Sequence, residues 1–147
     1  MRTFACLLLL ALAALPAPSR AQTASEPERV TVQHILIAFK GSIPDDPKVT
    51  RSKEDAEKLA LKVFERARAG EDFAAMVKMY TNDEYPGIYK MTNTGIAPDR
   101  SKQEFSRTGM VKSFGDVSFG LAVGAVGLAV YDPAASKYGW HIIKRIE

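Results

Sequence analysis

The chain has 147 residues, of which 46% are hydrophobic and 25% are charged, with 20 Lys and Arg against 17 Asp and Glu. This length and composition predict one soluble domain, large enough to bury a core without disulfides or a structural metal. The single Cys excludes a disulfide framework and a zinc cluster, and a formal net charge of +3 is too small for the phosphate contacts of a nucleic-acid-binding surface.

Residues 1–21 are predicted to be a secretory signal peptide. Arg2 precedes an apolar run over residues 4–15, and a small-residue cleavage pattern follows at residues 19–21. The run is shorter than the roughly 20 residues that span a bilayer. We therefore expect cleavage before Gln22 and export to the periplasm or the outside, without stable membrane insertion. A retained interfacial anchor is the alternative.

Removal of residues 1–21 would leave 126 residues with 18 basic and 17 acidic side chains and no Cys, which excludes a cysteine nucleophile. Residues 22–28 are small and polar and predict a flexible tail. Residues 29–147 are then the folded domain.

The domain is predicted to begin with a strand over residues 29–39, because this segment is rich in Val, Ile and Thr. Alternation places Val32, His34 and Leu36 on one face, and Gln33, Ile35 and Ile37 on the other. Residues 40–49 contain two prolines and two aspartates and predict an exposed loop.

Two helices are predicted next. Ser52 is a typical N-cap, and Gly70 can end the first helix in the left-handed conformation. A second helix follows Asp72 and stops near Asn82. Each has an apolar stripe at helical spacing: Ala56, Leu59, Ala60, Val63, Phe64 and Ala67 in the first, and Phe73, Met76, Val77 and Tyr80 in the second.

The remaining chain gives a weaker pattern. Residues 84–107 predict a long loop with a short strand near residues 87–91. Residues 111–121 predict a short helix, and residues 127–131 and 138–146 predict a closing hairpin. The order β-α-α-loop-α-β-β predicts an α+β domain with an antiparallel sheet.

Only two histidines occur, and both lie in apolar strands. His34 is in the first strand and His141 in the last, where an imidazole needs a hydrogen-bond partner. If these strands are antiparallel neighbours, the two rings can satisfy each other. Two independent structural histidines are the alternative.

Several segments resemble the parvulin family of peptidyl-prolyl cis/trans isomerases over most of residues 30–147. They are VQHILIAFKG, AGEDFAAM, YTND, FSRTGMVKSFGDVSFGL, VGAVG and YGWHIIK, in that order. The resemblance implies a parvulin-like, FKBP-like fold in which about four helices wrap a four-stranded antiparallel sheet. It also implies an enzyme that accelerates rotation about X-Pro bonds in polypeptide clients.

The resemblance implies site residues as well. His34 and His141 match the family's paired histidines, Asp83 the residue facing the reacting imide, and Ser136 a hydroxyl that hydrogen-bonds the pair. The proline pocket is expected at Met110, Val111 and Phe114, although for Met110 and Phe114 plain core packing explains the pattern equally well. Its third wall is either Tyr89 or the pair at residues 95–96.

The loop at residues 40–48 departs from phosphoprotein-directed parvulins, because Asp45 and Asp46 lie where a basic cluster would bind phosphate. We therefore expect a non-covalent isomerase without a requirement for phosphorylation, without a cofactor or metal, and monomeric. Two other functions remain open: a parvulin-like binding module or chaperone without turnover, and a metal site formed by His34, His141 and Asp83.

Overall fold

The computed structural model describes residues 25–147, so the predicted signal peptide and the first part of the tail lie outside the described residues. The helices and strands, in chain order, are β1 (Arg29–Ile37), α1 (Lys53–Arg68), α2 (Phe73–Tyr80), β2 (Ile88–Thr92), β3 (Glu104–Ser106), α3 (Lys112–Gly120), β4 (Val126–Ala129) and β5 (Trp140–Arg145). Short 3₁₀ turns precede and follow β3. Among residues 25–147, no helix has both the length and the apolar character needed to cross a bilayer.

The sheet has five strands in the order β3-β2-β1-β5-β4, with β1 at its centre. Four strands pair antiparallel as predicted, but β3 adds a parallel edge strand beside β2. The expected four-stranded antiparallel sheet is therefore a five-stranded mixed sheet, and residues 25–147 contain three α-helices where about four were expected. Sequence patterns did not indicate β3 because three residues are too few to show an alternation.

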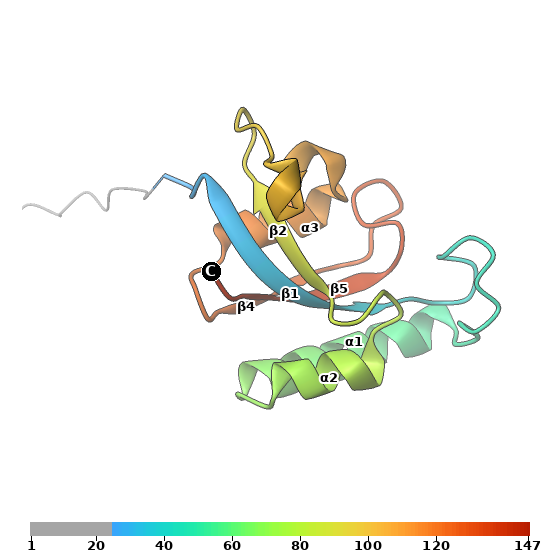
Figure 1. Ribbon diagram of the computed structural model, residues 1–147. Helices are drawn as coiled ribbons and strands as arrows, with labels where there is room; N and C mark the ends of the chain where they lie inside the picture. Colours follow the sequence, from blue (N-terminus) through green and yellow to red (C-terminus); the bar gives the residue numbers. More distant parts are fainter. Residues whose placement is uncertain (1–24) are drawn as a thin grey trace, which may run out of the picture.

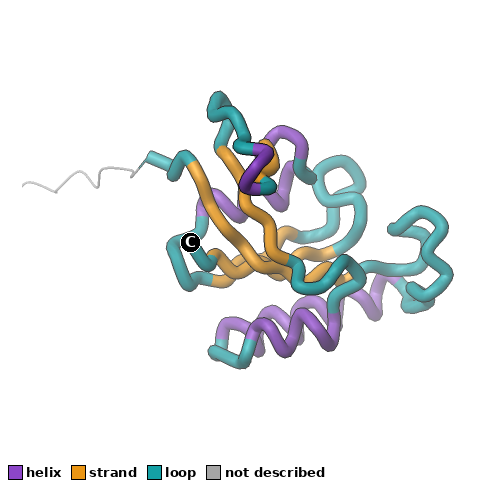
Figure 2. The backbone as a smooth tube through the Cα atoms, in the orientation of Figure 1, coloured by secondary structure: helices purple, strands orange, loops and turns teal. Residues whose placement is uncertain are grey.

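Helices cover both faces of the sheet (Figures 1 and 2). α1 and α2 lie side by side on one face, and α3 lies on the other. The first face packs Ile35, Ile37 and Ile142 against the apolar stripes of both helices, and the second packs Val32 and Ile143 against α3. The predicted division of β1 into two buried faces is confirmed.

The ends of α1 and α2 are those predicted. The Ser52 hydroxyl accepts a hydrogen bond from the Asp55 backbone N–H, and the Asp72 carboxylate accepts one from the Ala75 N–H. Gly70 follows α1 with a φ of 90°, the left-handed conformation expected after a helix. Local sequence signals were sufficient to predict these boundaries.

The described end of the predicted flexible tail is held against the domain. The Glu26 carboxylate accepts hydrogen bonds from Arg107 and Asn93, and the Glu28 carbonyl accepts one from the Asn93 N–H at 2.8 Å. Arg107 in turn donates to Asp116 on α3. Residues 26–28 are thus attached to the β2–α3 region, which their polar composition did not predict.

Candidate functional site

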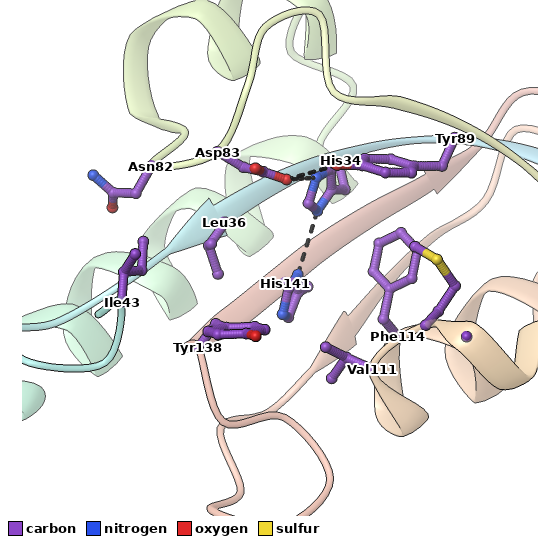
Figure 3. Close-up of a pocket in the computed structure, with 12 residues that line it drawn as sticks. His34, Leu36, Ile43, Asn82, Asp83, Tyr89, Val111, Phe114, Tyr138 and His141 are labelled. Carbon is purple, nitrogen blue, oxygen red and sulfur yellow. Dashed lines mark hydrogen bonds and ion pairs between the residues drawn. The ribbon is translucent and has the colours of Figure 1, made fainter. Parts of the chain in front are cut away.

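A cavity of about 370 Å³ lies between the α3-facing side of β1 and β5 and the start of α3 (Figure 3). Imidazole, carboxylate and amide groups lie along one wall, and apolar side chains form much of the remainder. It is lined by His34, Leu36, Ile43, Asn82, Asp83, Tyr89, Gly109, Met110, Val111, Phe114, Tyr138 and His141.

The two histidines hydrogen-bond to each other across neighbouring central strands. In the antiparallel register of β1 and β5, His34 pairs with Ile143 and His141 with Leu36, which places the rings diagonally. Their Nδ1 atoms lie 3.3 Å apart, and both residues are buried. The prediction that adjacent strands would pair the histidines is confirmed.

Asp83 binds the other nitrogen of His34. The His34 Nε2 lies 2.9 Å from the Asp83 Oδ2, and the Tyr89 hydroxyl donates to the same oxygen at 3.0 Å. The hydrogen bond from His34, aided by other donors, lowers the pKa of Asp83 to about 2. Burial and the adjacent carboxylate raise the pKa of Tyr89 to about 12. At neutral pH the site therefore holds an ionised Asp83 and a protonated Tyr89 hydroxyl.

These contacts specify a chain of proton donors. Because an ionised carboxylate only accepts, the His34 Nε2 carries a proton and donates it to Asp83. Burial lowers the pKa of His141 to about 3, so this ring is neutral. The two Nδ1 atoms share one proton in their hydrogen bond. The His141 Nε2 is buried and has no hydrogen-bond partner.

The segment after α2 positions Asp83 by pairing with β1. The Leu36 N–H donates to the Thr81 hydroxyl, the Ala38 N–H to the Asn82 side-chain oxygen, and the Asn82 N–H to the Leu36 carbonyl. This segment occupies the edge of β1 beyond the end of β2. The segment is anchored at Leu36 of β1, and it therefore fixes Asp83 beside His34, which lies two residues before Leu36 in the same strand.

A glycine permits the approach of the chain that follows. The His34 N–H donates to the Gly87 carbonyl at 2.9 Å. A Cβ at Gly87 would lie 2.7 Å from the His34 carbonyl oxygen, and its φ of 68° also disfavours other residues. Gly87 thus allows β2 to begin directly beside the histidine and to present Tyr89.

The predicted apolar residues come together on the α3 side of the cavity. The Phe114 ring lies edge-on to His34, with centroids 5.1 Å apart, and to His141 at 5.4 Å. Met110, Val111 and Tyr89 line the same cavity. Tyr89 lines this cavity, whereas residues 95 and 96 do not.

Ser136 is placed differently from its prediction. Its buried hydroxyl donates to the Gly139 carbonyl at 2.9 Å, not to a histidine, and Ser136 does not line the cavity. Its backbone pairs with Asp132 in the β4–β5 connection. The short side chain closes this turn locally, so its contact with the site is indirect, through the start of β5.

Five cavity residues escaped sequence reasoning: Leu36, Ile43, Asn82, Gly109 and Tyr138. Leu36 was assigned to the correct face of β1, and Asn82 lies within the YTND segment, so both had a signal. Ile43 lies between polar loop residues, and Tyr138 precedes a strand, so neither had a pattern that predicted a site.

Residues 25–147 contain no cluster of three or more His, Cys, Asp or Glu side chains that could hold a metal ion.

The five-stranded sheet, with a central histidine pair beside a partly apolar cavity, agrees with the resemblance to peptidyl-prolyl isomerase domains of the parvulin class. The family described as "PPIC-type PPIASE domain" matches residues 19–147. Because this match covers most of the sequence, the chain belongs to that family.

Curated relatives agree with this assignment. The chain is 30% identical over 117 residues to the chaperone SurA of Pseudomonas fluorescens, covering 80% of this chain and 22% of SurA. It is 36% identical over 88 residues to the foldase protein PrsA 4 of Bacillus cereus, covering 60% of this chain and 27% of that protein. The chain thus spans about a quarter of the length of these relatives.

Solved structures share the fold. The solution structure of TbPIN1 superimposes with a TM-score of 0.57 at 23% identity, covering 82% of this chain and 98% of that one. The peptidyl-prolyl isomerase ESS1 from Candida albicans gives a TM-score of 0.54 at 21% identity, covering 82% of this chain and 63% of that one.

Proposed function

We propose that this protein accelerates cis/trans rotation about X-Pro bonds in polypeptide clients. The observation that carries the proposal is the cavity itself, in which Met110 and Phe114 lie beside the hydrogen-bonded His34–His141 pair. A pyrrolidine ring fits an apolar pocket of this kind, and the polar wall lies where the adjoining imide carbonyl would move. Membership of the isomerase family supports the same function.

The reaction needs no bond cleavage. The barrier to rotation is about 18–20 kcal/mol because resonance gives the amide C–N bond partial double-bond character. The planar imide is more polar than the twisted one, so a site that removes water from it favours rotation. Met110, Val111 and Phe114 would hold the proline ring while the carbonyl turns.

The polar groups shape the field around the rotating carbonyl. Asp83 holds a proton on the His34 Nε2, and the two rings are joined through their Nδ1 atoms. A carboxylate whose pKa is about 2 is a weak base, so Asp83 acts through its negative charge and its hold on His34. The mechanism is non-covalent, and Ser136 acts as a positioning residue through the turn before β5.

We propose that clients need no phosphorylation before proline. Among the described residues, the twelve that line the cavity include no Lys or Arg, and Asp83 adds a negative charge. Asp45 and Asp46 lie in the loop that also carries Ile43. A phosphate dianion near this site would meet repulsion without a paired cation.

The proposed setting is outside the cytoplasm. The sequence of residues 1–21 supports export to the periplasm or the medium, where unfolded proline-containing chains would be the clients and the domain, residues 29–147, would act as a monomer. The relatives named as a chaperone and a foldase support polypeptide clients.

A protease-coupled assay on X-Pro peptides tests the proposal. Wild-type protein should raise the isomerisation rate above the thermal rate, and Met110→Ala should lower kcat/KM by about tenfold because a large part of the proline contact is lost. Peptides with phosphoserine before proline should be poorer substrates than those with serine. Peptide binding without any increase in rate would instead identify a binding module or chaperone.

A further inference from the structure

A row of rings crosses the α3-facing side of the sheet and extends beyond the proline cavity. His141, His34, Tyr89 and Phe105 come from β5, β1, β2 and β3, with successive centroid distances of 5.5, 5.1 and 5.7 Å. Phe105 is the outermost ring, and it is 47% exposed. The row therefore ends in an aromatic ring that is about half exposed to solvent.

A second cavity, of about 190 Å³, lies against Phe105; we call it the Phe105 cavity. It is lined by Pro98, Arg100, Glu104, Phe105, Ser106, Gly109 and Met110. Gly109 and Met110 also line the proline cavity, so the two cavities share a wall. Gly109 contributes no side chain to that wall.

The Phe105 cavity suits an aromatic side chain. Pro98, Phe105 and Met110 supply apolar contacts. The Glu104 carboxylate already accepts hydrogen bonds from Arg29 and from the Asp99 N–H, so it is not a free anion. The guanidinium of Arg100, which also lines the cavity, is a group that stacks on aromatic rings.

We propose that the Phe105 cavity binds an aromatic side chain of the client two positions from the isomerised proline. This inference rests on the proposed function, because it places the proline beside Met110. Strands in a sheet are about 5 Å apart, and side chains at i and i±2 of an extended chain lie on one side at roughly 6–7 Å. The proline cavity and the Phe105 cavity share Gly109 and Met110, so they are neighbours at this scale, whereas the adjacent client residue would point away.

Three peptides with a single proline test the inference. One has Phe two positions before the proline, one has Phe two positions after it, and one has Ala at both. Dissociation constants are measured by following amide NMR shifts. The wild-type protein should bind one of the Phe peptides about fivefold more tightly than the Ala peptide.

Matched variants assign that preference to the Phe105 cavity. Phe105→Ala should bring the ratio to about one, and Phe105→Tyr should keep it because the ring remains. Leu61→Ala is the control: Leu61 is 48% exposed but lies on α1, on the opposite face of the sheet, so the ratio should stay at its wild-type value.

Equal affinity of the wild-type protein for all three peptides would overturn the inference without any variant. The same preference in wild type and folded Phe105→Ala would also overturn it. Isomerisation of the same peptides is measured separately. Preference without isomerisation would refute the proposed activity alone, and isomerisation without preference would refute the Phe105 cavity alone.

Discussion

Replacement of Asp83 by Asn tests the electrostatics of the site, because it removes the charge while keeping an oxygen acceptor of similar size. A decrease in the pKa of the carboxyl from 3.8 to about 2 corresponds to roughly 2 kcal/mol in favour of the ionised form. The Asp83 side chain is 31% exposed, so solvent screening reduces the expected contribution to stability to about 1–2 kcal/mol.

The sign of the pH dependence follows from the direction of this change. Since the pKa is lower in the folded protein, the stabilisation is fully present above pH 4, where the unfolded carboxyl is ionised. It is lost as the pH falls through about 2. Wild type should therefore exceed Asp83→Asn in unfolding free energy by about 1–2 kcal/mol at pH 7 and 5, by roughly half of that at pH 3, and by little at pH 2.

Urea denaturation at pH 7, 5 and 3 measures the difference directly. With slopes of about 1–3 kcal/mol per M, the midpoints should differ by roughly 0.5–1 M at pH 7 and by about half of that at pH 3. A difference that stays constant from pH 7 to pH 3, or a variant as stable as wild type at pH 7, would refute the donor chain from His34 to Asp83.

Three further substitutions or titrations test the same geometry. Gly139→Ala should destabilise the protein by more than about 3 kcal/mol, because its Cβ would lie 2.2 Å from the Ile37 carbonyl oxygen. The control is Gly70→Ala, which has open space around its Cβ and should cost about 1 kcal/mol. Equal losses of stability for the two variants in thermal melts would contradict the close approach at Gly139. His141 should stay neutral down to about pH 4 in an NMR titration of its ring, since burial lowers its pKa to about 3; a midpoint near 6.5 would show that the ring is not buried as described. Ser136→Ala should lose about 1 kcal/mol of stability with the hydrogen bond to Gly139, while the His141 ring shifts stay unchanged; a large change in those shifts would favour a direct hydrogen bond to the histidine pair.

Much of the fold was predictable from local patterns. Ser52 and Gly70 flank a helix that has a complete apolar stripe, and the second helix was predicted from an apolar stripe of the same kind. The histidines were informative because an imidazole in an apolar strand needs a partner, and the antiparallel pairing of β1 and β5 supplies one. These signals depend on residues close in sequence or on a simple pairing rule.

Features that depend on distant contacts were not predictable in the same way. β3 is held by parallel pairing with β2 and has only three residues, so periodicity could not reveal it. Ile43 lines the cavity only because its loop folds back towards Tyr138. Ser136 was assigned a contact by resemblance, but the turn that it closes uses the hydroxyl for Gly139 instead.

Catalysed exchange in a single-proline peptide tests the central claim most directly. With the protein at a small fraction of the peptide concentration, two-dimensional exchange NMR should show cis/trans exchange on the scale of a second or faster, against tens of seconds or longer without it. Met110→Ala should reduce that increase by about tenfold. Exchange that remains at the uncatalysed rate in the presence of folded wild-type protein would contradict the account.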